Sequence, residues 1–193
     1  MKTILKLAAM VVAGTIIGYA GMSTVLRVRG YLDIVTNGNS WVTAKGIGSK
    51  DADPMLKAIV AVIGIFANAK EEAIYFQAYQ GSPLSKMKGG HHYQIKGNVN
   101  IPGKWWSITL YNEDEFLFNN PDRRYSFTNF NLETDDSGNF TIDVAPVKPI
   151  DAENWLPSPS SENISLTFRI YEPEEQLYQN IVSFPLPSVS EVL

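Results

Sequence analysis

The stretch ISLTFRIY, residues 164–171, alternates without a break between large apolar side chains and side chains of other kinds. Neighbouring side chains on a β-strand point to opposite faces of the sheet, so a period of two divides this stretch into two faces. One face would carry Ile164, Leu166, Phe168 and Ile170, and the other would carry Ser165, Thr167, Arg169 and Tyr171. We therefore predict a β-strand that places its apolar face in a hydrophobic core.

Two further stretches alternate in the same way. AIYFQAY, residues 73–79, sets Ile74, Phe76 and Ala78 against Tyr75, Gln77 and Tyr79. WWSITLY, residues 105–111, sets Trp106, Ile108 and Leu110 against Trp105, Ser107, Thr109 and Tyr111. Across the three strands the second face holds aromatic rings, hydroxyls, a glutamine and one arginine, which suits a small-molecule or glycan ligand. The alternative is that a helix or loop simply covers this face.

The remainder of the chain after residue 72 also reads as short strands separated by turns. We predict strands at residues 73–79, 92–97, 105–112, 124–130, 140–145 and 164–172. Turn sequences such as Asn119-Asn-Pro-Asp and Asp136-Ser-Gly-Asn separate them. The fold class is therefore mainly β with an N-terminal helical part (α+β). We expect an antiparallel β-sandwich or jelly-roll-like domain, preceded by a membrane helix and one buried helix.

The buried helix is predicted over residues 54–68. Asp53 is a good N-cap and Pro54 fits the first helical position. Lys57 is almost the only polar residue in this stretch, so no solvent-facing side is evident. Residues 31–52 are rich in Gly, Asn, Ser and Lys and lack apolar periodicity. We expect three parts: an anchor or signal segment at 1–30, a linker at 31–52, and a single β-rich domain with a leading helix at 53–193.

The N-terminal segment contains twenty consecutive uncharged residues, 7–26 (LAAMVVAGTIIGYAGMSTVL). A helix of that length spans about 30 Å, the thickness of a bilayer core. The apolar run continues past the small-x-small site Gly18-Tyr19-Ala20 and exceeds the usual apolar part of a signal peptide. An uncleaved membrane anchor is therefore favoured, with a cleaved signal peptide and a buried core helix as alternatives.

Basic residues flank this apolar run on both sides and specify its orientation only weakly. Lys2 and Lys6 precede it, and Arg27 and Arg29 follow it. The amino terminus adds to the lysines, so we favour a single-pass protein of the inner (cytoplasmic) membrane with its domain in the periplasm. The alternative is secretion to the periplasm after signal cleavage.

Composition excludes several classes of function. The chain has no cysteine, which excludes disulfides, thiolate metal sites and a cysteine nucleophile. Its net charge is −4, and residues 31–193 alone carry 12 basic and 20 acidic residues, a net charge of −8. Such a domain repels phosphate backbones, so we expect no nucleic-acid partner. Dinucleotide, phosphate-loop and HExxH motifs are absent from the sequence, and we predict neither a cofactor nor a metal.

Catalytic groupings are sparse. The acids Glu113, Asp114 and Glu115 could form an acid–base pair, but they follow a strand directly and fit a polar turn better. His91 and His92 are the only histidines, and adjacent strand residues point apart, which disfavours joint metal binding. An enzymatic role therefore stays open without a defined catalytic set.

Six segments, read in order, resemble a known family. They are Asp51-Ala-Asp-Pro, EAIYF (72–76), WWSITLY (105–111), NPDRRYS (120–126), NWLPSP (154–159) and LTFRIYEP (166–173). Over roughly residues 48–188 the chain is similar to domain of unknown function 1214 in its short, membrane-anchored bacterial form. The resemblance implies a β-rich sandwich, a bacterial envelope setting and an N-terminal anchor, and it implies no established reaction. It adds weight to Tyr75, Trp106, Tyr111, Asn120, Arg124, Tyr125, Asn154, Trp155, Arg169 and Tyr171.

The leading functional hypothesis is a membrane-anchored extracytoplasmic domain that binds a small molecule, a glycan or an envelope partner. Arg169 would anchor an anionic or hydroxylated group. The other candidate ligand-binding residues are Tyr75, Tyr111, Arg124, Trp155 and Tyr171. An envelope hydrolase or lyase, and a purely structural or assembly domain, are the alternatives.

Overall fold

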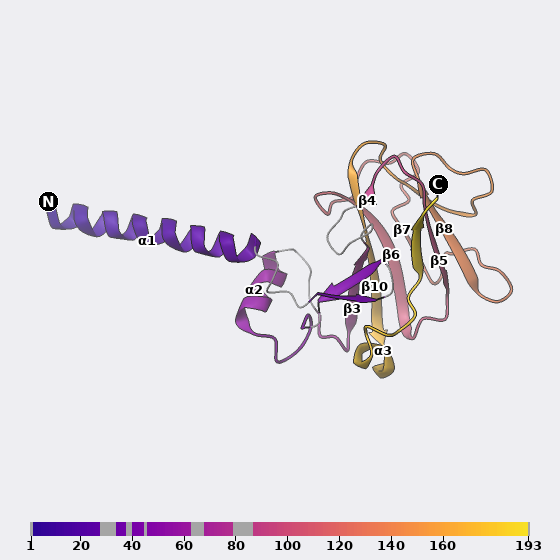
Figure 1. Cartoon of the computed structure of the whole chain (residues 1–193), viewed down its shortest axis with the longest axis horizontal. Coiled ribbons are helices and arrows are strands. Elements are labelled where there is room, and N and C mark those ends of the chain that lie inside the picture. The colour runs from indigo at the N-terminus through magenta and orange to yellow at the C-terminus, as the bar shows by residue number, and fades with distance from the viewer. Residues whose placement is uncertain are drawn as a thin grey trace.

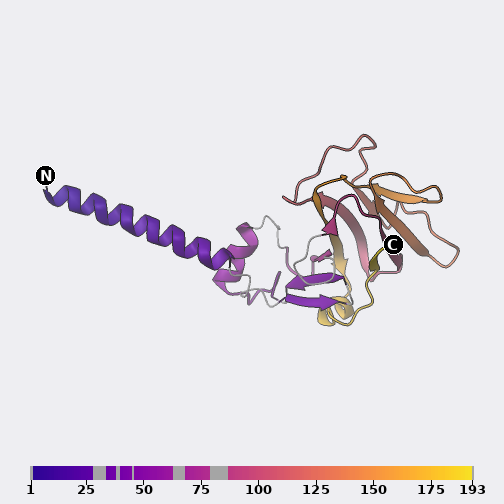
Figure 2. The ribbon, with the colours of Figure 1, turned by 45° about the horizontal axis from the view of Figure 1, so that its top comes forward.

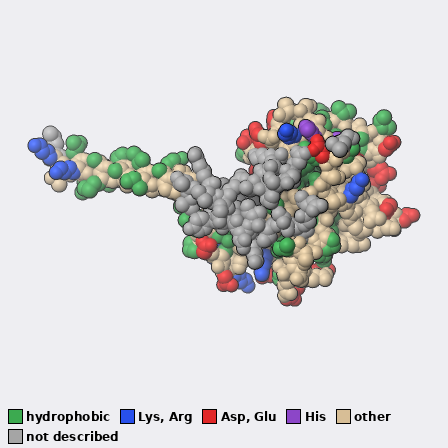
Figure 3. Space-filling model, viewed as in Figure 1, with side chains coloured by type: hydrophobic (Ala, Val, Ile, Leu, Met, Phe, Trp, Pro, Cys, Tyr) green, Lys and Arg blue, Asp and Glu red, His purple; other side chains and the backbone are tan. Residues whose placement is uncertain are grey.

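The computed structural model of the chain describes residues 2–27, 34–37, 40–44, 46–62, 68–78 and 87–192. Helix α1 (Lys2–Arg27) extends away from a β domain, as Figure 1 shows. Its part Lys2–Ser23 has a mean hydropathy of 1.8 and is long and apolar enough to cross a membrane. Hydrophobic side chains cover α1, with basic ones at its N-terminal end (Figure 3). Because none of this span is buried, the alternative of a core helix is wrong.

The larger sheet has seven strands in the described part of the chain, and all their pairings are antiparallel. Its order is β1-β2-β3-β10-β6-β7, with β4 also paired to β10. The strands are β1 (Ile34–Asn37), β2 (Trp41–Ala44), β3 (Ala73–Ala78), β4 (Met87–Lys88), β6 (Gly103–Asn112), β7 (Ser126–Thr128) and β10 (Asn163–Pro173). The stretch ISLTFRIY thus forms the central strand, with Phe168 opposite both Phe76 and Ile108.

The smaller sheet has the order β11-β5-β8-β9. Its strands are β5 (Tyr93–Asn98), β8 (Asn139–Ala145), β9 (Asn154–Pro157) and β11 (Ser188–Glu191). The pairing of β8 with β9 is parallel, in contrast to the antiparallel strands predicted from the sequence. Ala145 ends β8, and Asn154 lies opposite Ile142. The chain therefore needs to return by only three residues, roughly 10 Å, which a short loop can span.

The core lies between the two sheets. Trp106 and Phe168 of the larger sheet pack edge to face, with ring centroids 5.7 Å apart. Phe140 of the smaller sheet lies 5.6 Å from Trp106, which joins the two layers. Ile164, Leu166, Phe168 and Ile170 are all fully buried, as the alternation predicted. The predicted mainly β, sandwich-like fold is therefore confirmed.

Residues 31–52, predicted as a linker, contain two strands of the larger sheet. β2 pairs with β3 and inserts Trp41 into the core, where it is only 1% exposed. A strand of four residues is too short to display a periodicity of its own. The surrounding Gly and Asn residues are typical of a linker, so the strand was not recognisable in the sequence.

Helix α2 (Pro54–Val62) begins where the sequence predicted, because the Asp53 Oδ1 atom accepts the Met55 and Leu56 amide hydrogens at 2.8 and 3.1 Å. The described part of α2 ends at Val62, and residues 63–67 of the predicted helix lie outside the described residues. The helix that was expected to be buried is only partly buried: Leu56 and Val60 are buried, whereas Pro54 and Ala61 are exposed in addition to Lys57. Figure 2 shows α2 at the end of the domain nearest α1.

Helix α3 (Glu175–Gln179) follows the central strand directly and has no counterpart among the predicted elements. Its Leu177 is fully buried at one end of the sandwich. The chain then leads through residues 180–187 to β11.

Candidate functional site

Four of the six candidate side chains share the outer face of the larger sheet with Trp105. Arg169 lies opposite Tyr75 on one side and Ser107 on the other, while Tyr171 lies opposite Trp105. All five large side chains are half-buried. We call this set the aromatic–arginine face: Tyr75, Trp105, Tyr111, Arg169 and Tyr171.

Arg169 is held by an aromatic ring. Its Nη2 atom donates a hydrogen bond to the Tyr111 hydroxyl at 2.9 Å, and its Cζ atom lies 5.3 Å from the centroid of that ring. Tyr111 lies opposite Ser165, and Thr167 lies between Ser165 and Arg169 on the same face of β10. The side chains of Tyr111 and Arg169 therefore meet over Thr167. Thr167 is only 6% exposed as a result. Arg169 forms no salt bridge within the described part of the chain.

Two of the aromatic members of the face are in ring contact. The rings of Trp105 and Tyr171 lie 4.8 Å apart with a 42° tilt. Partial burial raises the pKa of Tyr75, the nearby Tyr171 raises it further, and Arg169 acts in the opposite direction. The Tyr75 phenol therefore stays protonated at neutral pH and can donate a hydrogen bond.

The acidic triplet lies in the loop that follows β6, as its sequence position predicted. Glu115 Oε2 accepts a hydrogen bond from Ser165 Oγ at 3.0 Å, and Glu113 Oε2 accepts one from Asn163 Nδ2 at 3.0 Å. Both contacts tie this loop to the start of β10. Two of the three acids therefore have structural partners, and no acid–base pair is formed between them.

Two predicted site residues lie elsewhere, so the structure does not bring the six candidates together. Trp155 belongs to β9 of the other sheet, where its Nε1 atom donates to the Ala145 carbonyl at 2.8 Å. It cannot form a wall around Arg169. Arg124 is exposed in the loop before β7, with its Cζ atom 5.4 Å from the Phe127 ring centroid. The sequence motifs group these residues with Arg169, but Trp155 lies on the other sheet and Arg124 lies in a loop.

A buried carboxylate that the sequence reasoning missed lies on the smaller sheet. Asp143 is 5% exposed, and its Oδ1 atom contacts His92 Nε2 at 2.7 Å and accepts a hydrogen bond from Gln94 Nε2 at 3.0 Å. His91 instead pairs with Glu191 of β11, so the two histidines do point apart. No cluster of metal-binding side chains occurs in the described ranges. The alternation of β8, with Asp143 between Ile142 and Val144, was the available signal.

Two motif asparagines serve the fold. Asn154 is 2% exposed, and its side chain bonds to both the amide and the carbonyl of Glu133 and to the Thr141 carbonyl. Asn120 is 4% exposed and donates to the Arg124 carbonyl at 3.0 Å. Both hold loops against the sandwich, which is a sufficient reason for their presence in the motifs.

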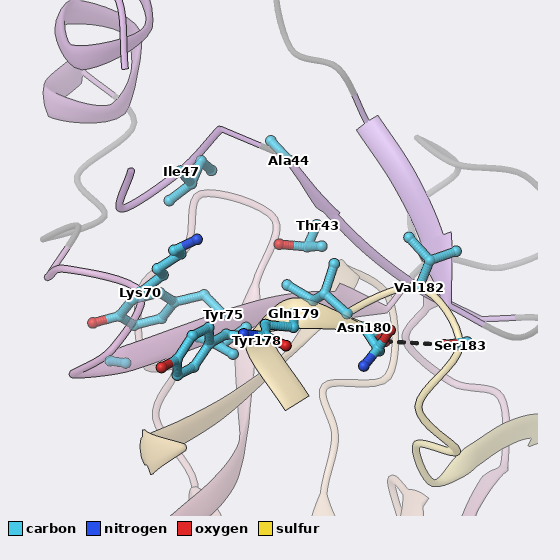
Figure 4. Close-up of a pocket in the computed structure, with 13 residues that line it drawn as sticks. Thr43, Ala44, Ile47, Lys70, Tyr75, Tyr178, Gln179, Asn180, Val182 and Ser183 are labelled. Carbon is cyan, nitrogen blue, oxygen red and sulfur yellow. Dashed lines mark hydrogen bonds between the residues drawn. The ribbon is translucent and has the colours of Figure 1, made fainter. Parts of the chain in front are cut away.

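A pocket of about 410 Å³ opens beside the aromatic–arginine face, with which it shares Tyr75. Figure 4 shows Lys70 and two tyrosines on one side of it, Thr43 and Ile47 above, and Asn180 and Val182 on the other side. Its walls come from β2, β3, α3 and residues 180–183. The pocket was not predictable from the sequence, because its lining residues lie far apart in the chain.

These features define a class: a two-sheet β domain that follows an apolar helix and presents aromatic side chains around one arginine. The family model described as "Protein of unknown function (DUF1214)" matches residues 72–175, and the chain belongs to that family. No curated protein matches the chain.

Two solved structures are similar to this chain. The VPA0106 protein from Vibrio parahaemolyticus has 23% sequence identity and a TM-score of 0.59, and the match covers 74% of this chain and 36% of that one. An uncharacterised protein from Burkholderia cenocepacia has 15% identity and a TM-score of 0.43, over 62% of this chain and 30% of that one. The first likeness supports the fold alone, and the chain spans only about a third of either structure's length.

Proposed function

We propose that the protein is a membrane-anchored binding domain whose aromatic–arginine face takes a small hydroxylated molecule or a glycan. The observation that carries this proposal is the set of contacts around the Arg169 guanidinium. Its guanidinium is oriented by the Tyr111 hydroxyl, lies beside Tyr75, and has no carboxylate partner in the part of the chain that is described. A cation fixed in this way is ready to bind hydroxyl or carboxylate oxygens.

The aromatic pair supplies the apolar half of the site. Trp105 and Tyr171 are half-exposed, and rings of this kind pack against the C–H faces of sugars while their polar atoms remain hydrated. Arg169 and the protonated Tyr75 then provide donors at the edge of that platform. A ligand with one flat apolar face and several hydroxyls matches this combination.

The N-terminal helix supports the proposed anchoring of the domain to a membrane. α1 is an uncleaved single-pass anchor of the inner membrane, with its N-terminus in the cytoplasm and the β domain in the periplasm. The length and hydropathy of α1 support the anchor, and the lysines before it support the orientation. The ligand would then be a component of the bacterial envelope.

The test measures glycan binding by the full-length protein in lipid nanodiscs. A panel of neutral and uronic-acid oligosaccharides is screened by ligand-observed NMR, and the best ligand is titrated. Arg169→Ala and Tyr171→Ala should each weaken binding by about tenfold or more, equivalent to about 1.4 kcal/mol. The matched controls Arg124→Ala and Trp155→Phe lie off the face and should leave affinity unchanged.

Thermal unfolding of the same variants separates binding from folding. If Arg169→Ala and Tyr171→Ala leave every ligand-induced shift in unfolding temperature as it is in the wild type, the face is structural and the proposal fails.

A further inference from the structure

We infer that the pocket between β3 and α3 is a second, separate site that binds a small monocarboxylate with an apolar body. We call it the α3 pocket. It goes beyond the proposed glycan-binding face, because it has its own walls and shares only Tyr75 with that face. Its volume of about 410 Å³ lies within the range of roughly 300–1,000 Å³ that is usual for small-molecule sites.

One cation marks the anion-binding end of the pocket. Lys70 is the only cationic side chain among the described lining residues. Its Nζ atom lies 5.5 Å from the centroid of the Tyr178 ring, and it forms no salt bridge within the described residues. Partial burial raises the pKa of Tyr178, and the carboxylates of Glu175 and Glu71 raise it further. The Lys70 ammonium therefore lies over the face of the Tyr178 ring at the pocket wall, where it can donate to one carboxylate group.

The position of Lys70 is fixed by the backbone. Its amide donates to the Gly48 carbonyl at 3.1 Å. Gly48 has a φ of 75°, and a Cβ atom there would lie 2.7 Å from the Asn68 carbonyl oxygen. The close approach of these two segments holds the base of the Lys70 side chain at the wall of the pocket.

The remaining lining explains why the ligand should be apolar beyond its charged end. Ile47, Ile74 and Val182 contribute aliphatic surface to the walls. The carbonyl of Asn180, at the end of α3, already accepts amide hydrogens from Ser183 and Phe184 at 3.0 and 3.2 Å. The lining side chains of Gln179, Asn180 and Ser183 are also hydrogen-bonded, to Glu175, the Gln176 carbonyl and the Asn180 carbonyl. The polar part of this wall therefore already has partners, and an aliphatic ligand body fits better.

The surrounding charge limits the ligand to a single negative charge. Exposed acids surround the Lys70 side of the pocket: Glu71, Glu72 and Glu175. The charge of Glu72 raises the pKa of Tyr75, and the charges of Glu175 and Glu71 raise the pKa of Tyr178. One lysine can compensate one carboxylate, but a second ligand charge would meet these acids unpaired. Phosphorylated ligands and dicarboxylates are therefore disfavoured.

The experiment uses full-length protein in nanodiscs with ¹³C-labelled isoleucine methyl groups, so that Ile47, Ile74 and Ile181 report on the pocket. Octanoate is the probe, and octanol and octanedioate are its neutral and dianionic counterparts. Octanoate should shift these methyl signals and bind about tenfold or more tightly than either counterpart. Lys70→Met should remove the preference for octanoate over octanol, and Lys70→Arg should keep it.

Two controls make every result decisive. Lys104→Met removes a lysine that lies outside the pocket and pairs with Glu172, so it should leave the affinities of all three ligands unchanged. Val182→Trp should weaken all three ligands, because it fills the pocket. Equal binding of octanoate and octanol, an unaffected Lys70→Met variant, or no methyl shift at saturation would each overturn the inference. Arg169→Ala should leave octanoate binding intact, which keeps this test independent of the proposed glycan-binding face.

Discussion

Replacement of Asn154 by alanine tests whether this motif residue serves the fold. Three hydrogen bonds would be lost: Glu133 N to Oδ1 at 2.8 Å, and Nδ2 to the carbonyls of Glu133 and Thr141 at 2.8 and 3.1 Å. At about 0.5–1.5 kcal/mol for each bond, the expected loss of unfolding free energy is about 1.5–4.5 kcal/mol. That is a large share of the roughly 5–15 kcal/mol that stabilises a typical domain.

The assay is urea unfolding of the full-length protein, followed by tryptophan fluorescence and analysed by linear extrapolation. Asn100→Ala is the matched control, since Asn100 is exposed and should change stability by no more than about 0.5 kcal/mol. Asn154→Asp keeps an acceptor for the Glu133 amide but sets a carboxylate against two carbonyls, so it should be no more stable than Asn154→Ala. A loss below about 0.5 kcal/mol for Asn154→Ala would refute the structural interpretation.

Two further predictions concern Tyr93 and Gly48. Burial raises the pKa of Tyr93 above its ordinary value of 10.0, while its bond from the Lys88 amide lowers it. A raised pKa in the folded state means that its stabilising contribution is complete below pH 10 and lost as the pH rises beyond it. As the pH rises from about 8 to about 11, the unfolding free energy measured with urea should therefore fall less for Tyr93→Phe than for the wild type. Parallel curves of unfolding free energy against pH would contradict this. Gly48→Ala should cost about 1–3 kcal/mol in the same assay. It should cost more than Gly138→Ala, because both glycines have positive φ but only Gly48 has backbone atoms within 3.0 Å of the added Cβ; equal losses would count against this argument.

The strand pattern was predictable where strands were long and had one buried face. In β3, β6 and β10 the period of two correctly separated core residues from outer ones, including Tyr75, Tyr111 and Arg169. The burial of a whole apolar face is a strong energetic constraint, so local sequence carries the information.

The pairing between strands was not predictable from the same patterns. Trp155 has a large aromatic side chain like Tyr171, yet strand order places the two on different sheets. Trp41 entered the core through a strand of only four residues. The α3 pocket was hidden for the same reason, because Lys70 and Tyr178 approach each other only after long-range pairing has formed.

The central position of β10 has a consequence for how the protein is made. Every other described strand of the larger sheet precedes β10 in the chain, and β10 joins β3 to β6. During synthesis β3 would leave the ribosome long before β10 is translated. The edge of β3 that pairs with β10 would stay unpaired until then. Sheets that depend on such distant contacts close slowly and expose strands that can aggregate. The open edge of β3 would therefore persist until residue 173 has been translated.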